Sequence, residues 1–260
     1  MIEIDRLSIN ITDICDMNCA HCLRGDGHGR KLDVSLIPKI FENISSVQSL
    51  TITGGEPGCN IEAVSAIVNY LKDHKNDIHV MGCFIATNGK QYHQELVDAV
   101  KTLLWLELER NFDMEKKVIT YENAKMNHSF MEEYKYQFGI AVSLDMFHEP
   151  IPMENYMKYY VSGIYQDVKE IDYSRMGVIS RGRGANLKQS HYRESYGMRI
   201  EHESDELYVD EIYVSVDGNV FTDCDISYEM EEYESESYGD LYESSLADII
   251  KEYDKRSEEE

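Results

Sequence analysis

The segment Ile14-Cys15-Asp16-Met17-Asn18-Cys19-Ala20-His21-Cys22 decides the fold, because it gathers three of the six cysteines of the chain into one short loop. A secreted protein held together by disulfides would spread its cysteines along the sequence. In a reducing compartment, a tight cluster of cysteines indicates metal ligation or redox chemistry. The segment directly follows an alternating apolar stretch at residues 7–11, which predicts a strand that ends in the cysteine loop.

The spacing Cys15-x-x-x-Cys19-x-x-Cys22 leaves two kinds of metal site open. Thiolates hold iron–sulfur clusters, and four are usual for a [4Fe–4S] cluster. Three thiolates leave one iron without a protein ligand, and that iron can bind a small chelating molecule. The alternative is structural zinc with a fourth ligand from His21, His28 or Cys59. Zinc sites favour cysteine pairs separated by two residues, and because only one pair here has that separation, the spacing favours iron–sulfur.

Outward from this loop, short strand patterns alternate with amphipathic helix patterns. Strands are expected at residues 7–11, 50–53, 78–86, 139–144 and 176–180, and helices at residues 34–44, 61–71, 96–104 and 156–164. The charged stretch at about 105–138 is typical of an insertion, with a helix near residues 129–136. The alternation predicts an α/β fold with parallel strands, in which ligands bind at the carboxyl ends of the strands.

Each of the chemically suggestive motifs follows a predicted strand. Gly54-Gly55-Glu56-Pro57 follows the second strand and Thr87-Asn88-Gly89 follows the third. Ser143 and Asp145 share one face of the next strand because side chains alternate along it. Arg181-Gly182-Arg183-Gly184 follows the strand at residues 176–180. The motifs are therefore expected to meet at one edge of the sheet.

Taken in this order, the cysteine triad, Gly54-Gly55-Glu56-Pro57 and Thr87-Asn88-Gly89 resemble the signature of the radical SAM superfamily, over about residues 5–190. The segments at 142–145 and 178–185 are similar to the ribose and adenine motifs of that family. The resemblance implies a partial (β/α)6 TIM-like barrel, a [4Fe–4S] cluster and S-adenosylmethionine. It also implies an enzyme that reductively cleaves S-adenosylmethionine to a 5′-deoxyadenosyl radical, which then abstracts hydrogen from a substrate. A protein that binds cluster or cofactor without catalysis is the alternative.

The resemblance also implies roles for individual residues. Cys15, Cys19 and Cys22 would each bind one iron, and the methionine part of the cofactor would chelate the fourth. Glu56 would accept a hydrogen bond from the methionine ammonium, beside glycines that let the backbone approach the ligand. His21 is either a ring packed near the adenine or a plain loop histidine, and His148 and Glu149 are substrate contacts or surface residues. The expected cofactor contacts are Gly54, Gly55, Glu56, Asn88, Ser143, Asp145, Arg181 and Arg183.

A different pattern begins after about residue 190 and predicts two units, 1–190 and an acidic extension at 191–260. Residues 211–216 alternate, Asp217-Gly218 is a hairpin turn signal and residues 219–221 begin a return strand. A last helix is expected at 244–253. Residues 216–224 and 238–250 resemble the two ends of a SPASM-type extension, but Cys224 is the only cysteine after Cys83. We therefore expect a hairpin and helix that close the barrel without an auxiliary cluster. Cys59, Cys83 and Cys224 are expected as small buried side chains, with a substrate contact as the alternative for Cys59, which lies two residues past Pro57.

Charge and hydropathy limit the partners. The net charge is −24, and residues 201–260 hold 22 Asp and Glu against 3 Lys and Arg. Such a surface repels phosphate backbones, so nucleic acid is not an expected partner. The sequence has no long apolar run and no signal peptide, which predicts a cytoplasmic protein without a membrane span. The resemblance implies a flavodoxin- or ferredoxin-type electron donor and a peptide or protein substrate, with a small-molecule substrate as the alternative.

Overall fold

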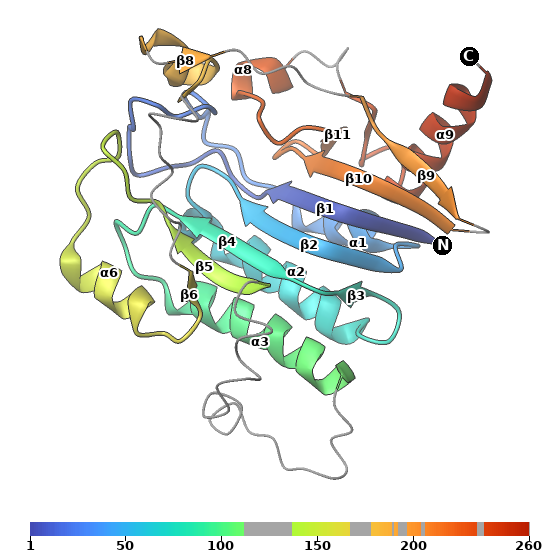
Figure 1. Ribbon diagram of the computed structural model, residues 1–260, viewed down its shortest axis with the longest axis horizontal. Helices are drawn as coiled ribbons and strands as arrows, with labels where there is room; N and C mark the ends of the chain where they lie inside the picture. Colours follow the sequence, from blue (N-terminus) through green and yellow to red (C-terminus); the bar gives the residue numbers. More distant parts are fainter. Residues whose placement is uncertain are drawn as a thin grey trace.

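The computed structural model describes residues 1–111, 137–166, 178–188, 190–191, 197–203, 206–232 and 237–259 (Figure 1). The strands are β1 Ile2–Asn10, β2 Ser46–Thr53, β3 His79–Val80, β4 Cys83–Thr87, β5 Phe138–Val142, β6 Tyr165–Gln166, β7 Val178–Ile179, β8 Ser190–His191, β9 Ile200–Glu203, β10 Glu206–Val214, β11 Asn219–Phe221 and β12 Gly239–Asp240. The helices are α1 Ile37–Phe41, α2 Ile61–Asp73, α3 Gln94–Asn111, α6 Met153–Tyr160, α8 Tyr228–Glu231 and α9 Leu246–Glu259, with 3-10 turns η1 Val34–Leu36, η2 Pro57–Asn60 and η3 Gly182–Asn186.

A parallel sheet in the order β10-β1-β2-β4-β5-β6 forms the centre of the molecule. Its strands end on the left in Figure 1, where the cysteine loop and the β7-η3-β8 segment also lie. β11 and β12 extend the sheet beyond β10 in the antiparallel sense. The expected α/β fold with parallel strands is confirmed, and the motifs that follow the strands lie at one end of the sheet.

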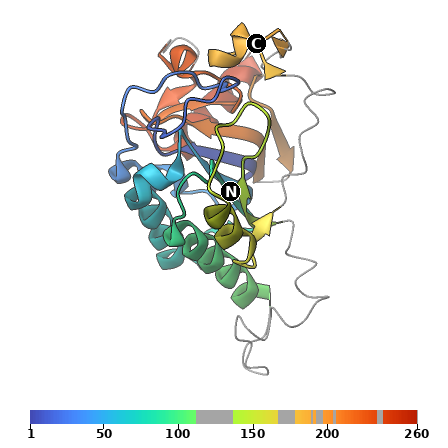
Figure 2. The same ribbon diagram turned by 90° about the vertical axis from the view of Figure 1, so that its left-hand side faces the viewer.

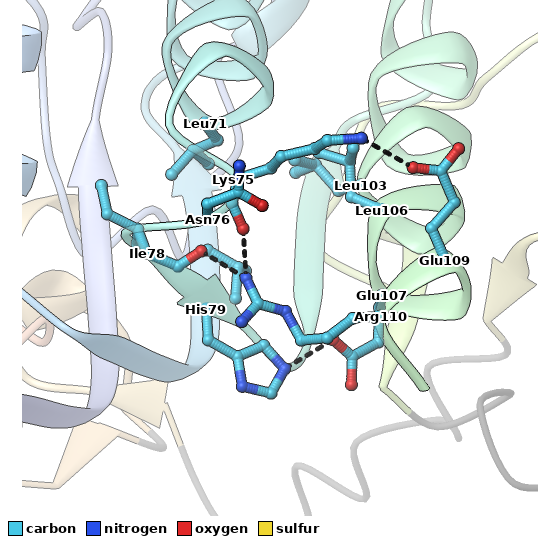
Figure 3. A pocket seen from close by; sticks show the side chains of 11 residues that line it. Leu71, Lys75, Asn76, Ile78, His79, Leu103, Leu106, Glu107, Glu109 and Arg110 are labelled. Atoms are coloured by element: carbon cyan, nitrogen blue, oxygen red, sulfur yellow. Dashed lines mark hydrogen bonds and ion pairs between the residues drawn. The ribbon is translucent and has the colours of Figure 1, made fainter. Parts of the chain in front are cut away.

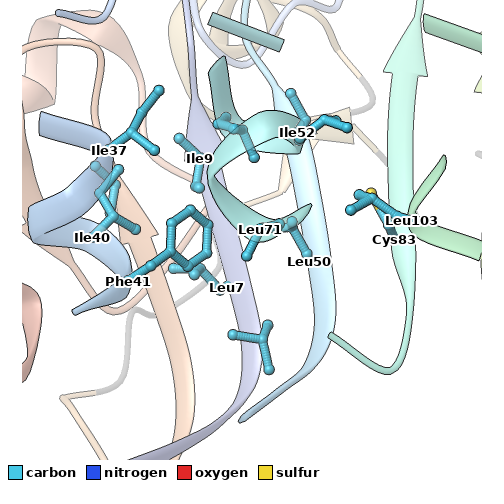
Figure 4. Close-up of a cluster of buried hydrophobic side chains, with 14 of the residues drawn as sticks. Leu7, Ile9, Ile37, Ile40, Phe41, Leu50, Ile52, Leu71, Cys83 and Leu103 are labelled. Carbon is cyan, nitrogen blue, oxygen red and sulfur yellow. The ribbon is translucent and has the colours of Figure 1, made fainter. Parts of the chain in front are cut away.

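Helices cover one face of this sheet, and the view turned by 90° shows them on a single side (Figure 2). Leu7 and Leu50 from the strands face Phe41 and Leu71 from the helices (Figure 4). Each fully buried side chain of this kind contributes about 1.5–3 kcal/mol, so the helix-covered face holds the fold together. The alternate positions of the strands point to the opposite face and carry small polar residues, among them Ser8, Thr51 and Thr53.

Several boundaries differ from the sequence-based expectations. The single strand expected at 78–86 is two strands, β3 and β4, with Met81 and Gly82 between them. The backbone at Gly82 passes so close to Gln137 that a Cβ would lie 2.7 Å from the Gln137 carbonyl oxygen. The helix expected at 34–44 is only η1 followed by α1. Residues 105–111 of the expected insertion continue α3, and the helix expected near 129–136 lies outside the described residues.

The C-terminal hairpin of β10 and β11 is confirmed, and α9 begins at Leu246 close to its expected start. The sequence did not predict which strand of the main sheet lies beside this hairpin. β10 runs parallel to β1 along its free edge, with Ile4 paired to Val209 and Ile9 paired to Val214. β1 is therefore an internal strand, and the extension continues the main sheet. The glycine-rich segment follows β7, which pairs with β8 in a separate two-stranded sheet.

Candidate active site

A cavity of about 510 Å³ lies at the carboxyl ends of the parallel strands, on the face that the helices leave open. All three cysteines of the triad line this cavity. Ser8, Thr51 and Thr53 from β1 and β2 line it as well, together with Ser143 after β5 and Val178 in β7. The lining also includes His21, Arg24, Gly54, Gly55, Asn88, His148, Arg183, Cys224 and Asp225.

Asp13 anchors the start of the cysteine loop. Its Oδ1 accepts a hydrogen bond from the backbone N–H of Arg30 at 2.7 Å, and its Oδ2 accepts from the backbone N–H of His28 at 3.0 Å. The same Oδ2 accepts from Arg30 Nε at 2.6 Å, and Arg30 also pairs with Asp217. Burial opposes the charge of Asp13, but the hydrogen bonds from Arg30 and His28 outweigh it and lower the pKa of Asp13. The loop is thereby tied to the C-terminal hairpin turn.

The glycine-rich segment clamps the other end of the loop. Arg183 donates from Nε to the carbonyl of Cys19 at 3.0 Å and from a guanidinium nitrogen to the carbonyl of Gly25 at 2.9 Å. Its backbone N–H donates to the carbonyl of Cys22 at 2.9 Å. Gly182 has φ of +52°, and a Cβ there would lie 2.7 Å from the Cys22 carbonyl oxygen. Only glycine fits this approach, so the segment holds two of the cysteines in place.

Gly54 and Gly55, which follow β2, allow the start of the cysteine loop to pack closely against the end of that strand. A Cβ on Gly54 would lie 2.5 Å from the Thr12 carbonyl oxygen, and a Cβ on Gly55 would lie 2.7 Å from the Ile14 carbonyl carbon. The backbone N–H of Gly55 donates to Thr12 O at 2.6 Å, and that of Glu56 donates to Ile14 O at 2.8 Å. The glycines therefore let the cysteine loop pack on the end of β2, and both also line the cavity.

Glu56 lies beneath the cavity and is not one of its lining residues. Its carboxylate accepts from Thr87 Oγ1 at 2.8 Å, from the backbone N–H of Asn88 at 2.7 Å and from that of Gly58 at 3.0 Å. Burial raises the pKa of Glu56, although these donors stabilise its charge. The side chain ties the end of β2 to the end of β4, so the expected ammonium contact would have to compete with three existing bonds.

Asn88 connects the end of β4 to the first cysteine. Its Nδ2 donates to Asp16 Oδ1 at 2.8 Å and approaches Cys15 Sγ at 3.6 Å. Cys19 is buried, and burial raises the pKa of its thiol. The thiol is therefore protonated near neutral pH, and a metal that bound there would displace the proton.

Ser143 lines the cavity, but Asp145 does not. Asp145 Oδ1 accepts from the backbone N–H of Phe147 at 2.7 Å and from that of His148 at 3.2 Å, which forms the turn after β5. Its Oδ2 lies 2.6 Å from His148 Nδ1 and 3.4 Å from His21 Nε2. Arg181, also expected to contact the cofactor, is buried outside the cavity lining, with a guanidinium nitrogen 3.6 Å from Asp223 Oδ2.

Arg24 lines the cavity beside the triad and binds buried groups of the extension, and the sequence did not indicate this role. Arg24 donates to the carbonyl of Ile226 at 2.9 Å and lies 4.5 Å from the ring centre of Tyr213. The Tyr213 hydroxyl donates to Glu231 at 2.5 Å and accepts from Asn10 Nδ2 at 2.9 Å. Arg24 follows the third cysteine by two residues, but neither periodicity nor composition indicates its distant partners.

A second cavity, of about 260 Å³, lies between α2 and α3 (Figure 3). Its ionic groups are bonded to their neighbours. His79 Nε2 lies 2.6 Å from Glu107 Oε2, Lys75 pairs with Glu109 at 3.0 Å, and Arg110 donates to the carbonyl of Ile78 at 2.9 Å. These bonds join the two helices to β3, so this cavity is a structural junction.

The larger cavity fits a cluster and an elongated ligand. Three thiols open into it, which suits the sulfur preference of iron. Beside them lie two glycines, the Asn88 amide and the Ser143 hydroxyl, which offer close backbone approach and hydrogen bonds. Five of the expected cofactor contacts thus line the cavity with the cysteines, and three, Glu56, Asp145 and Arg181, do not.

Residues 9–108 match the sequence family described as the Radical SAM superfamily. An uncharacterized protein of Methanocaldococcus jannaschii is 23% identical over 100 residues, which are 37% of this chain and 35% of that protein. The chain therefore matches about a third of this curated relative. Similar solved structures include anSMEcpe with bound AdoMet (12% identity, 95% of this chain, 80% of that chain, TM-score 0.44). Another is Streptococcus suis SuiB bound to precursor peptide SuiA (11% identity, 94% and 64% of the two chains, TM-score 0.43).

In the part of the chain that the structure describes, no helix is long and apolar enough to cross a bilayer.

Proposed function

We propose that this chain, whose residues 9–108 match the Radical SAM superfamily, is an enzyme in which Cys15, Cys19 and Cys22 hold a [4Fe–4S] cluster at which S-adenosylmethionine is reductively cleaved. The observation that carries the proposal is the convergence of the three thiols on one cavity with Gly54 and Gly55. A reduced cluster with bound S-adenosylmethionine supplies a 5′-deoxyadenosyl radical, which removes a hydrogen atom from the substrate. This chemistry belongs to the bound groups.

The residues of the chain position the cofactors and shape the cavity. Asp13 and Arg183 fix the two ends of the cysteine loop, so the three thiolates are presented together. Asn88 and Ser143 offer polar contacts to the cofactor from the ends of β4 and β5. Walls that keep water from the reacting atoms would protect a reactive species from side reactions. We also propose a flavodoxin or ferredoxin as the electron donor, on the basis of the resemblance alone.

The test is anaerobic reconstitution with iron and sulfide, followed by dithionite and S-adenosylmethionine. We expect a brown protein with about four irons per chain and formation of 5′-deoxyadenosine. Cys19→Ala is expected to lose both, whereas Cys83→Ala, a buried cysteine in β4, retains both. A colourless protein with one zinc would favour the structural zinc site, and a cluster without 5′-deoxyadenosine would favour a non-catalytic binding protein.

We further propose a peptide or protein substrate. The support is a group of exposed apolar side chains on the segment after β5, whose Ser143 and His148 line the cavity. These side chains are Leu144, Met146, Met153, Met157, Tyr160 and Val161. Contiguous exposed apolar side chains mark interaction surfaces, and methionines adapt to varied partners. The strong negative charge of the chain favours basic residues in such a partner.

This proposal can be tested with two peptides of equal length and equal apolar content, one rich in lysine and one rich in glutamate. The lysine-rich peptide is expected to raise the rate of 5′-deoxyadenosine formation, and Met153→Gln with Met157→Gln is expected to reduce that increase. Equal rates with both peptides and with no peptide would instead favour a small-molecule substrate.

A further inference from the structure

We propose that Arg24 is a specificity-determining residue whose guanidinium binds a carboxylate of the substrate inside the reaction cavity. Arg24 lines this cavity, yet only 9% of its surface is exposed. The proposal rests on the proposed function, because it takes this cavity as the place of reaction. It deepens that function by naming a chemical group of the substrate, which the cluster and S-adenosylmethionine do not determine.

The guanidinium of Arg24 has more hydrogen-bond donors than the protein uses. It carries five N–H groups, and Nη1 donates to the carbonyl of Ile226 at 2.9 Å. The same nitrogen lies 3.7 Å from Glu231 Oε1, which is too long for a hydrogen bond. In the part of the chain that the structure describes, Nε and Nη2 have no hydrogen-bond partner, and both still touch solvent-accessible space. Because buried donors normally have partners, these two nitrogens at the cavity wall indicate a ligand.

The residues around Arg24 hold its guanidinium in one orientation. The guanidinium carbon lies 4.5 Å from the ring centre of Tyr213, which is a cation–π contact. The Tyr213 ring is itself fixed, because its hydroxyl bonds to Asn10 and Glu231. The backbone carbonyl of Arg24 accepts the N–H of Tyr228 at 2.8 Å. A planar fork of donors fixed in this way is suited to bind a planar carboxylate through two parallel hydrogen bonds.

Arg24 lies on the β10 side of the cavity, away from the cofactor contacts expected after β4 and β5. It packs on Tyr213 in β10, whereas Asn88 follows β4 and Ser143 follows β5. In the sheet, β1 and β2 separate β10 from β4. The β10 side of the cavity is therefore the part that a substrate beside the cofactor would occupy.

Arg183 is the other arginine in the described lining of the cavity, and its donors are already used. It donates to the carbonyls of Cys19 and Gly25, and it pairs with Asp26. The net charge of −24 repels carboxylates from the rest of the molecule, so a substrate carboxylate needs a local cation such as Arg24. A lysine-rich substrate with one carboxylate near its reacting position would suit both the acidic surface and this arginine.

The experiment measures the binding of two fluorescently labelled lysine-rich peptides to the reconstituted protein by anisotropy. The peptides have equal length, blocked ends and a single glutamate or a single glutamine at the centre. The wild type is expected to bind the glutamate peptide at least about tenfold more tightly, because a bidentate pair of opposite charges is stronger than neutral hydrogen bonds. The net charge of the protein favours the opposite order, so this preference reports a local cation.

Arg24→Gln is expected to abolish the preference, and Arg24→Lys to retain only part of it, because an ammonium does not form the bidentate pair. Arg6→Gln is the matched control and is expected to keep the preference. Arg6 is half exposed on β1 and outside the cavity lining, and its loss changes the net charge by the same amount. Circular dichroism checks folding. If Arg24→Gln does not fold, the double variant with Glu231→Gln replaces it, since it leaves no buried carboxylate without its cation.

Equal affinity of the wild type for both peptides would overturn the proposal, as would a preference that survives in Arg24→Gln. If neither peptide binds, butyrate and butyramide are compared by calorimetry, and the absence of a preference for butyrate overturns it. A loss of S-adenosylmethionine affinity in Arg24→Gln with an unchanged peptide preference would assign Arg24 to the cofactor carboxylate instead. Iron and 5′-deoxyadenosine are measured on the same wild-type sample. Their absence would refute the proposed function, whereas the carboxylate preference tests Arg24 alone.

Discussion

Asp13→Asn is expected to destabilise the protein and to loosen the cysteine loop, although the change removes only one charge. Asp13 is fully buried and accepts three hydrogen bonds, from two backbone N–H groups and from Arg30 Nε. An asparagine has one oxygen, so in its better orientation it keeps the two bonds at Oδ2 and turns an amide N–H₂ toward the Arg30 N–H. In the other orientation it loses two bonds.

The magnitude follows from this count. A hydrogen bond involving a charged group is worth about 1.5–3 kcal/mol, and the two retained bonds also lose their charge assistance. We expect a loss of about 3 kcal/mol in the free energy of unfolding. For a chain of this size, each kcal/mol shifts Tm by about 2–4 °C, so Tm should fall by about 6–12 °C. Iron bound after reconstitution should fall as well, because Asp13 holds the start of the loop.

The assay is thermal unfolding followed by circular dichroism, together with iron quantification. Asp33→Asn is the matched control, because Asp33 is an exposed N-cap residue that accepts one backbone hydrogen bond from Ser35 at 2.9 Å and a long one from the Tyr242 hydroxyl at 3.4 Å. Asparagine caps helices as well as aspartate, so this control should change Tm by less than about 2 °C. A Tm for Asp13→Asn within that range of the wild type would refute the reasoning about the buried carboxylate.

Four further predictions concern other parts of the structure. Gly182→Ala should bind less than half the iron of the wild type and should melt several degrees lower, since its φ of +52° and its contact with Cys22 exclude a Cβ; full iron content would contradict the clamp. Arg183→Lys should lower 5′-deoxyadenosine formation at least about tenfold with little change in Tm, because an ammonium cannot reproduce the two fixed bonds to the loop carbonyls; activity near wild type would show that one bond suffices. Cys83 should resist alkylation at pH 8 in the folded protein and react in urea, because burial raises the pKa of its thiol to about 12; labelling before unfolding would disprove its burial. Tyr213→Phe should cost about 1–3 kcal/mol in chemical denaturation, because Asn10 and Glu231 both lose a buried partner; no change would mean that water replaces the hydroxyl.

The elements and the position of the site could be predicted from local patterns. The alternation of strand and helix periods sufficed for the parallel sheet, because both periods are properties of neighbouring residues. Once the strands were parallel, the motifs after them had to meet at one end, and the cysteines lie there with Gly54, Gly55 and Asn88. The polar position of Ser8 within an apolar strand was a usable signal for a further cavity residue.

Side-chain direction and long-range pairing could not be predicted in this way. Glu56 lies beneath the cavity because Thr87 and the backbone of Asn88 bind its carboxylate, and these partners belong to another strand. The alternation at residues 211–216 predicted a hairpin strand, but many strands have a pattern that would suit the free edge of β1. The place of Arg24 beside the cavity could not be predicted from the sequence. It depends on contacts with Ile226 and Tyr213, which lie near Arg24 only in the folded chain.

The pairing of β10 with β1 has a consequence for the order of events during synthesis. β1 acquires its second neighbour, β10, only when residues near 214 have emerged from the ribosome. At about 5–20 residues per second this interval lasts roughly 10–40 seconds, during which the cavity of the nascent chain lacks the lining that Cys224 and Asp225 later provide. The proposed cluster would therefore be inserted after translation of the acidic region, and a chain truncated before that region is expected to bind less iron.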